Sequence, residues 1–164
     1  MYVGHYELEL ESIPVIEFRI EEPETFGEYI RKLRILKGWS QKELARHIGL
    51  CFSTIIDYEK SRYIPQRRLI VRLLRALNAD VWEAIQFDGV LTERQKDILK
   101  AFPGQTFTHG DCIKLTGSRY LYGDLCYLVE LGILDKQSEG RMGYYRIREG
   151  DQQFWVPGLR VLLV

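Results

Sequence analysis

The chain has 164 residues, of which 46% are apolar and 28% are charged, a composition typical of a folded protein rather than a disordered one. Its length allows one ordinary domain or two small ones. No apolar run approaches the ~18 residues that a membrane-spanning helix needs, and the N-terminus lacks the pattern of a secretion signal, so we expect a cytoplasmic protein with no membrane partner.

The zero net charge conceals three unequal segments. Residues 1–23 carry six acids and one arginine, a net charge of −5, whereas residues 24–80 carry twelve bases and six acids, a net charge of +6. Residues 81–164 carry ten bases and eleven acids. The middle segment is therefore the candidate for binding a polyanion, the alternative being a solvated helical surface.

The first 23 residues predict a β extension. Tyr6, Leu8 and Leu10 alternate with polar residues before Pro14, and a second alternation follows it. A period of two indicates strands, and the proline indicates a break or bend between them. A two-stranded ribbon needs another sheet or a partner to cover its apolar face.

From Thr25 the apolar residues follow a helical period. We expect one helix to stop at Gly38 and a second to begin at Ser40 in a capping-box pattern and to end at Gly49. A third helix follows Cys51, and a fourth contains the leucines between residues 69 and 77. These helices define a predicted domain at residues 24–80.

A linker is predicted at residues 81–90, with a short helical turn around Trp82. A second domain is predicted at residues 91–149, with helix caps at Thr92 and Thr108, a longer helix from Ser118 to Gly132 and a hairpin with a glycine-rich tip. The order helix, helix, helix, hairpin is that of a winged helix. The tail at residues 150–164 is apolar, and we expect it to pair or pack as a strand.

The sequence offers no enzyme site. No phosphate-binding loop of the Walker type is present. The three cysteines are an odd set without C-x-x-C spacing, which favours reduced thiols. His109, Cys112 and Cys126 have irregular spacing, which favours two core thiols and a surface histidine over a metal site. We therefore expect no catalytic residues, no metal and no cofactor.

One motif in the basic segment is specific. Gly38-Trp39-Ser40-Gln41-Lys42-Glu43-Leu44-Ala45 is preceded by a helix with Arg34 and followed by Ile48-Gly49, Thr54-Ile55, Tyr58-Glu59 and Pro65. Over about 55 residues this pattern resembles the phage-repressor or Cro-type helix-turn-helix family, also called the xenobiotic-response-element family. The resemblance implies a helical DNA-binding domain that acts as a dimer.

The resemblance also implies roles for several residues. Gln41, at the start of the second helix, would face a DNA phosphate, where the helix dipole favours an anion. Ala45 would let two helices cross closely, and Gly49 would provide the turn between them. Arg34 and Glu59 would form a structural ion pair between the first and third helices.

The third helix, residues 51–60, would enter the major groove. With Ile55 pointing inward, Ser53 and Asp57 each lie about 160° away, and Lys60 about 140° away, so these three residues face outward. An acid can accept a hydrogen bond from cytosine, and apolar groups can contact thymine methyls. The predicted base contacts are Phe52, Ser53, Ile56 and Asp57.

Affinity would come from the flanks of this helix. The predicted phosphate contacts are Gln41, Lys42, Arg46, Lys60, Arg62, Arg67 and Arg68. Cys51 stands at the cap position, where the family usually has Ser or Thr. Asp57 is an unusual residue type at a position that contacts bases. The alternative is that Phe52 and Ile56 form a contact with another protein and that the helix recognises no DNA bases.

In the second domain we expect Arg119, Tyr120, Asp124 and Tyr127 to point outward from the long helix, with Arg141 at the hairpin tip. Two interpretations stay open for this domain. Arg119, Tyr120 and Arg141 would make a second DNA contact, or the domain would serve dimerisation or bind a partner.

The sequence thus predicts a mainly α protein, a lambda-repressor-like helix-turn-helix bundle followed by a winged-helix-like α/β domain with short terminal strands. The predicted function is a homodimeric transcriptional repressor that binds specific double-stranded DNA. The rival is an antitoxin-like interaction protein that binds a protein partner through residues 91–164.

Overall fold

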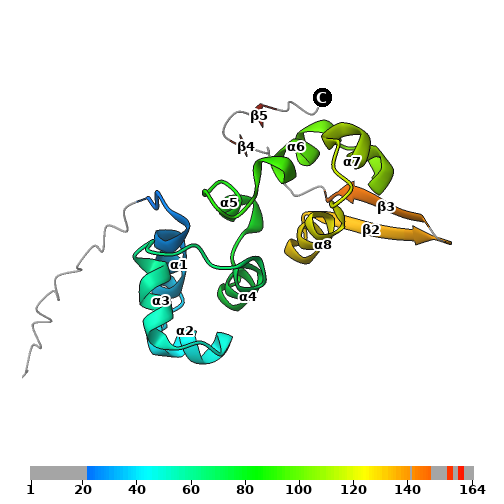
Figure 1. Ribbon diagram of the computed structural model, residues 1–164. Helices are drawn as coiled ribbons and strands as arrows, with labels where there is room; N and C mark the ends of the chain where they lie inside the picture. The colour runs from blue at the N-terminus through cyan, green and yellow to red at the C-terminus, as the bar shows by residue number, and fades with distance from the viewer. Residues whose placement is uncertain (1–21, 141, 149–154, 157–158, 161–164) are drawn as a thin grey trace, which may run out of the picture.

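The computed structural model describes residues 22–140, 142–148, 155–156 and 159–160 (Figure 1). The predicted N-terminal strands before residue 22 lie outside the described residues, as does Arg141. The described chain is mainly helical with a small antiparallel sheet, as the sequence predicts.

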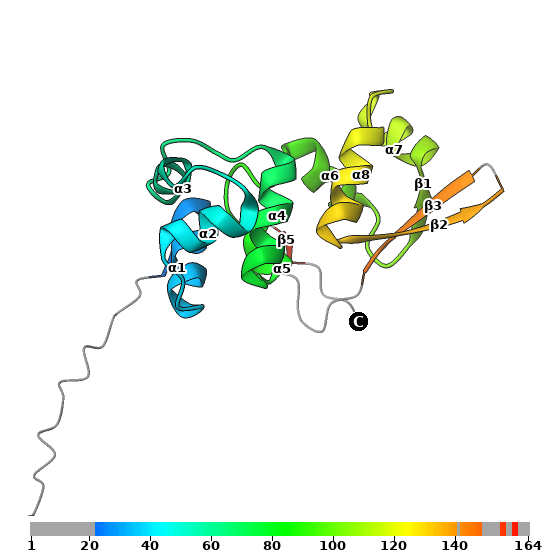
Figure 2. The same cartoon turned by 90° about the horizontal axis from the view of Figure 1, so that it is seen from below.

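Four helices and one short helix form the first half of the molecule. They are α1 (Phe26–Leu36), α2 (Gln41–Ile48), α3 (Phe52–Glu59), α4 (Arg67–Leu77) and α5 (Val81–Ala84). The short helical turn expected around Trp82 is confirmed by α5. Figures 1 and 2 show α1, α2 and α3 gathered on one side, with α4 between them and the second half.

Local capping explains where these helices begin and end. Ser40 accepts a hydrogen bond from the Glu43 amide, and the Glu43 carboxylate accepts one from the Ser40 amide, so the expected capping box is present. This backbone hydrogen bond holds the pKa of the Glu43 carboxyl below its usual value. Gly49 ends α2 with a φ of 62°, which favours glycine over residues that carry a Cβ.

Gly27 allows α1 and α3 to approach closely. A Cβ at this position would lie 2.0 Å from the carbonyl oxygen of Tyr58. Beneath the contact, Tyr29, Ile30 and Ile55 are fully buried in the core. The small residue therefore sets the distance between the first helix and α3.

The second half follows the order helix, strand, helix, helix, hairpin. Its elements are α6 (Glu93–Ala101), β1 (Thr106–Thr108), α7 (His109–Thr116), α8 (Tyr122–Leu131), β2 (Leu134–Glu139) and β3 (Met142–Ile147). The three strands form an antiparallel sheet in the order β1-β3-β2, with Phe107 opposite Tyr145. Capping boxes at Thr92 and Thr108 confirm the two expected helix starts.

The longer helix begins later than predicted. α8 starts at Tyr122, not at Ser118, because Gly117 ends α7 and the Ser118 hydroxyl accepts a hydrogen bond from the Tyr120 amide within a turn. Arg119 and Tyr120 consequently lie in the loop before α8 rather than on it. The three-residue strand β1, which pairs with β3, is an element that the sequence reading did not anticipate.

In the C-terminal tail, β4 (Trp155–Val156) and β5 (Leu159–Arg160) pair with each other in antiparallel fashion. The tail therefore contains strands, as expected. The rest of the tail lies outside the described residues.

The two halves pack together through α4 and α8, and their buried residues form one continuous core. Asp124 and Tyr127 of α8 are only 2% and 3% exposed. The expectation that they point outward is therefore wrong, because the face of α8 that carries them packs against α4 and α6 instead of solvent. The Tyr127 hydroxyl donates a hydrogen bond to the Val90 carbonyl, and burial raises the pKa of this phenol to about 12.

Candidate nucleic-acid interface

A buried polar network fixes α3 to α1 and α2. Arg34 of α1 and Glu59 of α3 form the expected ion pair, with Nε–Oε1 and Nη2–Oε2 distances of 2.5 and 2.9 Å. Arg34 also donates to the Trp39 carbonyl, at 2.7 Å. Both side chains are almost fully buried, so the pair fixes the position of α3 and offers nothing to a ligand.

Gln41 joins this network. Its Nε2 donates a hydrogen bond of 2.8 Å to Oε2 of Glu59. The amide therefore stands at the start of α2, as expected, but is oriented by the buried acid. The two residues are 18 positions apart, one at the start of α2 and the other at the end of α3, so helical periodicity alone does not predict this contact.

The exposure of α3 follows its helical projection. Ile55 is buried, Phe52 is 47% exposed, and Ser53 and Lys60 are exposed, while Ile56 and Asp57 are half-buried. The four candidate base contacts thus share the accessible side of the helix. The cap residue Cys51 is exposed, and its side chain makes no capping hydrogen bond, in contrast to Ser40.

Asp57 is not a free acceptor. Its Oδ1 lies 2.9 Å from Nη1 of Arg62, which belongs to the loop after α3. The pair joins a candidate base contact to a candidate phosphate contact. Arg62 neutralises the acid and orients its carboxylate, an effect of the loop after α3 that helical projection does not include.

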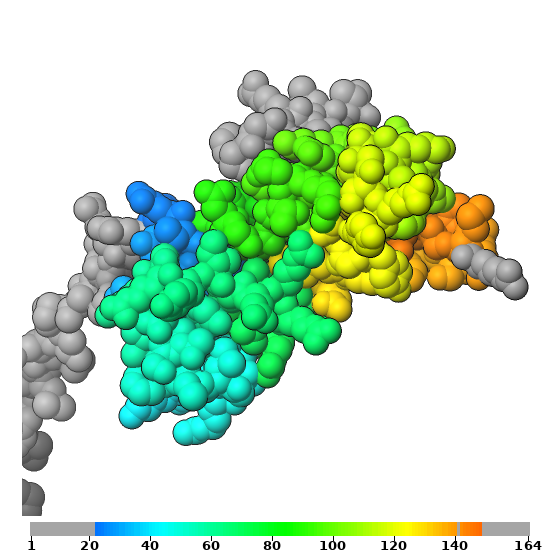
Figure 3. Space-filling view, viewed as in Figure 1, coloured from blue at the N-terminus to red at the C-terminus, as the bar shows by residue number. Residues whose placement is uncertain are grey.

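Cationic side chains surround the exposed side of α3. Lys42 lies 5.8 Å from the centre of the Phe52 ring, and Arg46, Lys60 and Arg68 are exposed. None of these four side chains forms an ion pair within the part of the chain that the structure describes. In the space-filling view α3 and the loop that follows it form part of one exposed face (Figure 3).

Arg67, at the first position of α4, has partners in the second half of the molecule. Its Nη1 lies 3.0 Å from Oδ1 of Asp124, and its guanidinium lies 5.4 Å from the centre of the Tyr127 ring. The sequence placed Arg67 among the phosphate contacts, whereas the structure shows it bound to a buried acid with 43% of its side chain exposed. Sequence reasoning did not name Arg94 and placed Asp124 on an outward face, since nothing local links either residue to residue 67.

The residues predicted for a second DNA contact belong to the second half of the molecule. Arg119 and Tyr120 are both exposed in the loop before α8, and Tyr120 is 89% exposed. No cluster of three metal-ligating side chains occurs among the described residues, and His109 gathers no such set with the two nearby cysteines. Within the same residues no helix has the length and apolarity to cross a membrane.

Comparison with known proteins agrees with this geometry. A family model described as helix-turn-helix matches residues 30–81, which run from within α1 to the first residue of α5. No solved structure matches the chain.

Three curated relatives are similar to part of the chain. Uncharacterized HTH-type transcriptional regulators from Archaeoglobus fulgidus and Methanothermobacter thermautotrophicus are 37% and 43% identical, over 84% and 81% of their own lengths. Multiprotein-bridging factor 1 of Schizosaccharomyces pombe is 35% identical over 44% of its length. Each match covers 34–37% of this chain. The chain therefore belongs to the helix-turn-helix family of transcriptional regulators.

Proposed function

We propose that the protein is a transcriptional regulator that binds specific double-stranded DNA through α3. The observation that carries this proposal is the combination of a rigidly held α3 with an accessible side and a rim of exposed cations. The Arg34–Glu59–Gln41 network removes freedom from α3 before binding, which lowers the entropic cost of docking.

Recognition then divides between two sets of groups. Phe52 and Ile56 offer apolar surface to thymine methyls, and Ser53 and Asp57 offer polar groups to base edges. Lys42, Arg46, Lys60 and Arg68 supply sequence-independent attraction to phosphates. Because Arg62 orients Asp57, we expect the carboxylate to accept from one cytosine amino group.

The proposal includes a homodimer that represses transcription. Helix-turn-helix regulators that dimerise bind half-sites about one helical turn apart, since each recognition helix enters a successive major groove. We therefore expect a near-palindromic operator. Repression follows if the bound dimer occludes a promoter.

The experiment is selection of bound duplexes from a random pool, followed by a gel shift at increasing salt. We expect a near-palindrome and an affinity that falls steeply with salt concentration. Arg46→Ala and Arg68→Ala should each reduce the salt slope by about 0.9, since each removes one phosphate contact. Arg148→Ala, in an exposed ion pair with Asp135 on the sheet, is the matched control. Failure to bind any duplex would sink the proposal.

A second function is favoured by exposed apolar groups in the other half. Tyr120 and Tyr122 are 89% and 61% exposed near the start of α8, and such side chains are often found in protein interfaces. An antitoxin-like role would show as a stoichiometric protein partner that copurifies from the native host. Loss of that partner in a Tyr120→Ala, Tyr122→Ala variant would assign it to this surface.

A further inference from the structure

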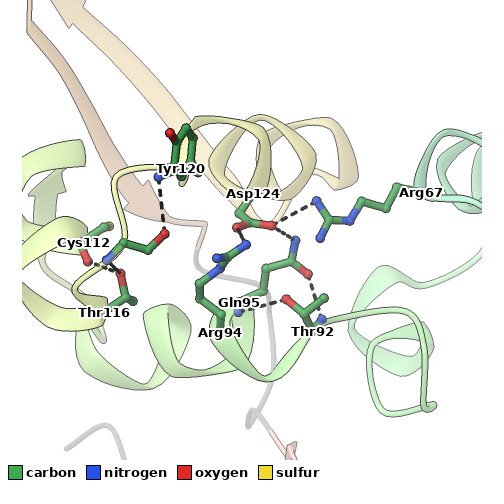
Figure 4. Close-up of polar contacts among 9 residues, drawn as sticks. Arg67, Thr92, Arg94, Gln95, Cys112, Thr116, Tyr120 and Asp124 are labelled. Carbon is green, nitrogen blue, oxygen red and sulfur yellow. Dashed lines mark hydrogen bonds and ion pairs between the residues drawn. The ribbon is translucent and has the colours of Figure 1, made fainter.

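Two arginines from different halves of the molecule meet on one buried carboxylate. Asp124 of α8 is 2% exposed, and its Oδ1 and Oδ2 lie 3.0 Å from Arg67 Nη1 and 2.6 Å from Arg94 Nη2 (Figure 4). The Gln95 amide donates a hydrogen bond of 2.9 Å to Oδ1. The two guanidinium groups and the carboxylate carry a net charge of +1.

Each arginine remains open to solvent on another side. The side chains of Arg67 and Arg94 are 43% and 42% exposed, although each has a nitrogen on Asp124. A guanidinium has five N–H donors in a planar fork, so one contact with a carboxylate leaves donors for a second anion. An arginine in this arrangement can hold its acid and a phosphate together.

The cluster also removes the freedom of these arginines. Arg67 is held by the carboxylate and by the Tyr127 ring, and Arg94 is held by the other carboxylate oxygen. Gln95 is itself fixed, because its Oε1 accepts from the Thr92 amide at 2.9 Å. The ordering of long side chains opposes binding through lost conformational entropy. Here most of that ordering is already present in the folded protein before DNA binds.

The position of the cluster connects it to the candidate interface. Arg67 follows the basic loop that leaves α3, and Arg68 is its exposed neighbour. Figure 3 shows the end of α3, the loop and the start of α4 on the same face as the start of α8. Arg94 lies beyond residues 30–81, so it extends this surface past the part that the family model matches.

We infer that Arg94 and Arg67 form a binding site for one or two DNA backbone phosphates, and that Asp124 is the positioning residue that holds both arginines for it. This inference rests on the proposed DNA binding. The second half of the molecule would then contact the DNA backbone through Arg94. It would not contact bases through the adjoining face of α8, because that face packs against α4.

The test is the salt dependence of binding to the selected duplex, measured by fluorescence anisotropy for the full chain. Arg94→Ala should reduce the salt slope by about 0.9, and Arg94→Lys should keep the slope because it keeps the charge. Arg94→Ala leaves Asp124 paired with Arg67 and Gln95, so the fold should persist. Arg148→Ala, with its exposed partner Asp135, is the control and should leave the slope unchanged.

Asp124→Asn provides the second readout. It leaves both arginine charges in place but no longer orders them, so we expect the salt slope to persist and the affinity to fall about three- to tenfold. If wild type binds but Arg94→Ala keeps its full slope, the phosphate site is overturned and the proposed function stands. Tighter binding by Asp124→Asn would also overturn it, because Asp124 would then withhold Arg67 from DNA. Absence of wild-type binding would overturn both proposals.

Discussion

Two helix pairs in this molecule have similar local layouts but different surroundings. α3 follows α2 after a short turn and keeps one side accessible, with Phe52 and Ser53 exposed. α8 follows α7 after a longer loop, and its Asp124 and Tyr127 are buried against α4 and α6. The comparison teaches that the neighbour of a helix, and not its own sequence, decides whether its polar face is free to bind.

The two halves also differ in the role of their buried charged groups. The first half contains a buried ion pair that orients α3, and its surface is strongly basic. The core of the second half consists mainly of apolar and aromatic side chains, and among its described residues the buried acid Asp124 forms an ion pair with Arg67 of the first half. The first half is therefore organised to present a helix, and the second to support it.

The largest expected effect comes from breaking the ion pair that distinguishes the first half. Arg34→Ala leaves Glu59 buried without its cation, so we expect a loss of about 3–5 kcal/mol in the free energy of unfolding. Chemical denaturation followed by circular dichroism measures this loss. Arg62→Ala, which removes an exposed pair with Asp57, should cost at most about 1 kcal/mol. Equal losses in the two variants would contradict the structural role of the buried pair.

A smaller loss of stability is expected from a substitution at the close contact between α1 and α3. Gly27→Ala forces a methyl group against the Tyr58 carbonyl, and overpacking of this kind costs about 1–3 kcal/mol. Gly123→Ala is the matched control in α8, because no atom beyond the chain neighbours and the backbone of α8 itself lies within 4 Å of the added group. Alanine favours a helix over glycine by about 0.5–1 kcal/mol, so the control should be slightly stabilised. Thermal unfolding of the two variants should shift in opposite directions, and a shared shift would refute this explanation of the close contact.

Much of the first half could be predicted because its signals are local. The capping box at Ser40, the turn at Gly49 and the inward side of α3 each depend on residues within a few positions, and the structure contains all three. The Arg34–Glu59 pair spans 25 residues and followed from a specific family resemblance. Local pattern and resemblance therefore agree for this half.

The candidate site was predictable only in part. The contact between Arg67 and Asp124 joins residues on separate halves, so the expectation that Asp124 points outward treated a packed face of α8 as a free one. The Asp57–Arg62 pair likewise depends on the path of a loop. Such contacts arise from tertiary packing, which a single-sequence pattern does not encode.

A further effect, confined to high pH, concerns the core of the second half. Burial raises the pKa of the Cys112 thiol to about 11 from an ordinary value near 9. Because the folded pKa is raised, this thiol adds stability that is complete below pH 9 and is lost as the pH rises toward 11. Cys112→Ala should therefore lose less stability than wild type over that range, whereas Cys51→Ala, at an exposed position, should follow wild type. Identical pH profiles for wild type and Cys112→Ala would contradict the burial.

The most direct test of whether α3 reads DNA is to compare the duplexes selected by wild type, Asp57→Ala and Arg68→Ala from one random pool. We expect Asp57→Ala to lose the preference for cytosine at one position in each half-site, because it removes the acceptor. Arg68→Ala should weaken binding to all duplexes and select the same sequence. If Asp57→Ala and a Ser53→Ala variant both select the wild-type sequence, the accessible side of α3 does not read bases and the central claim is wrong.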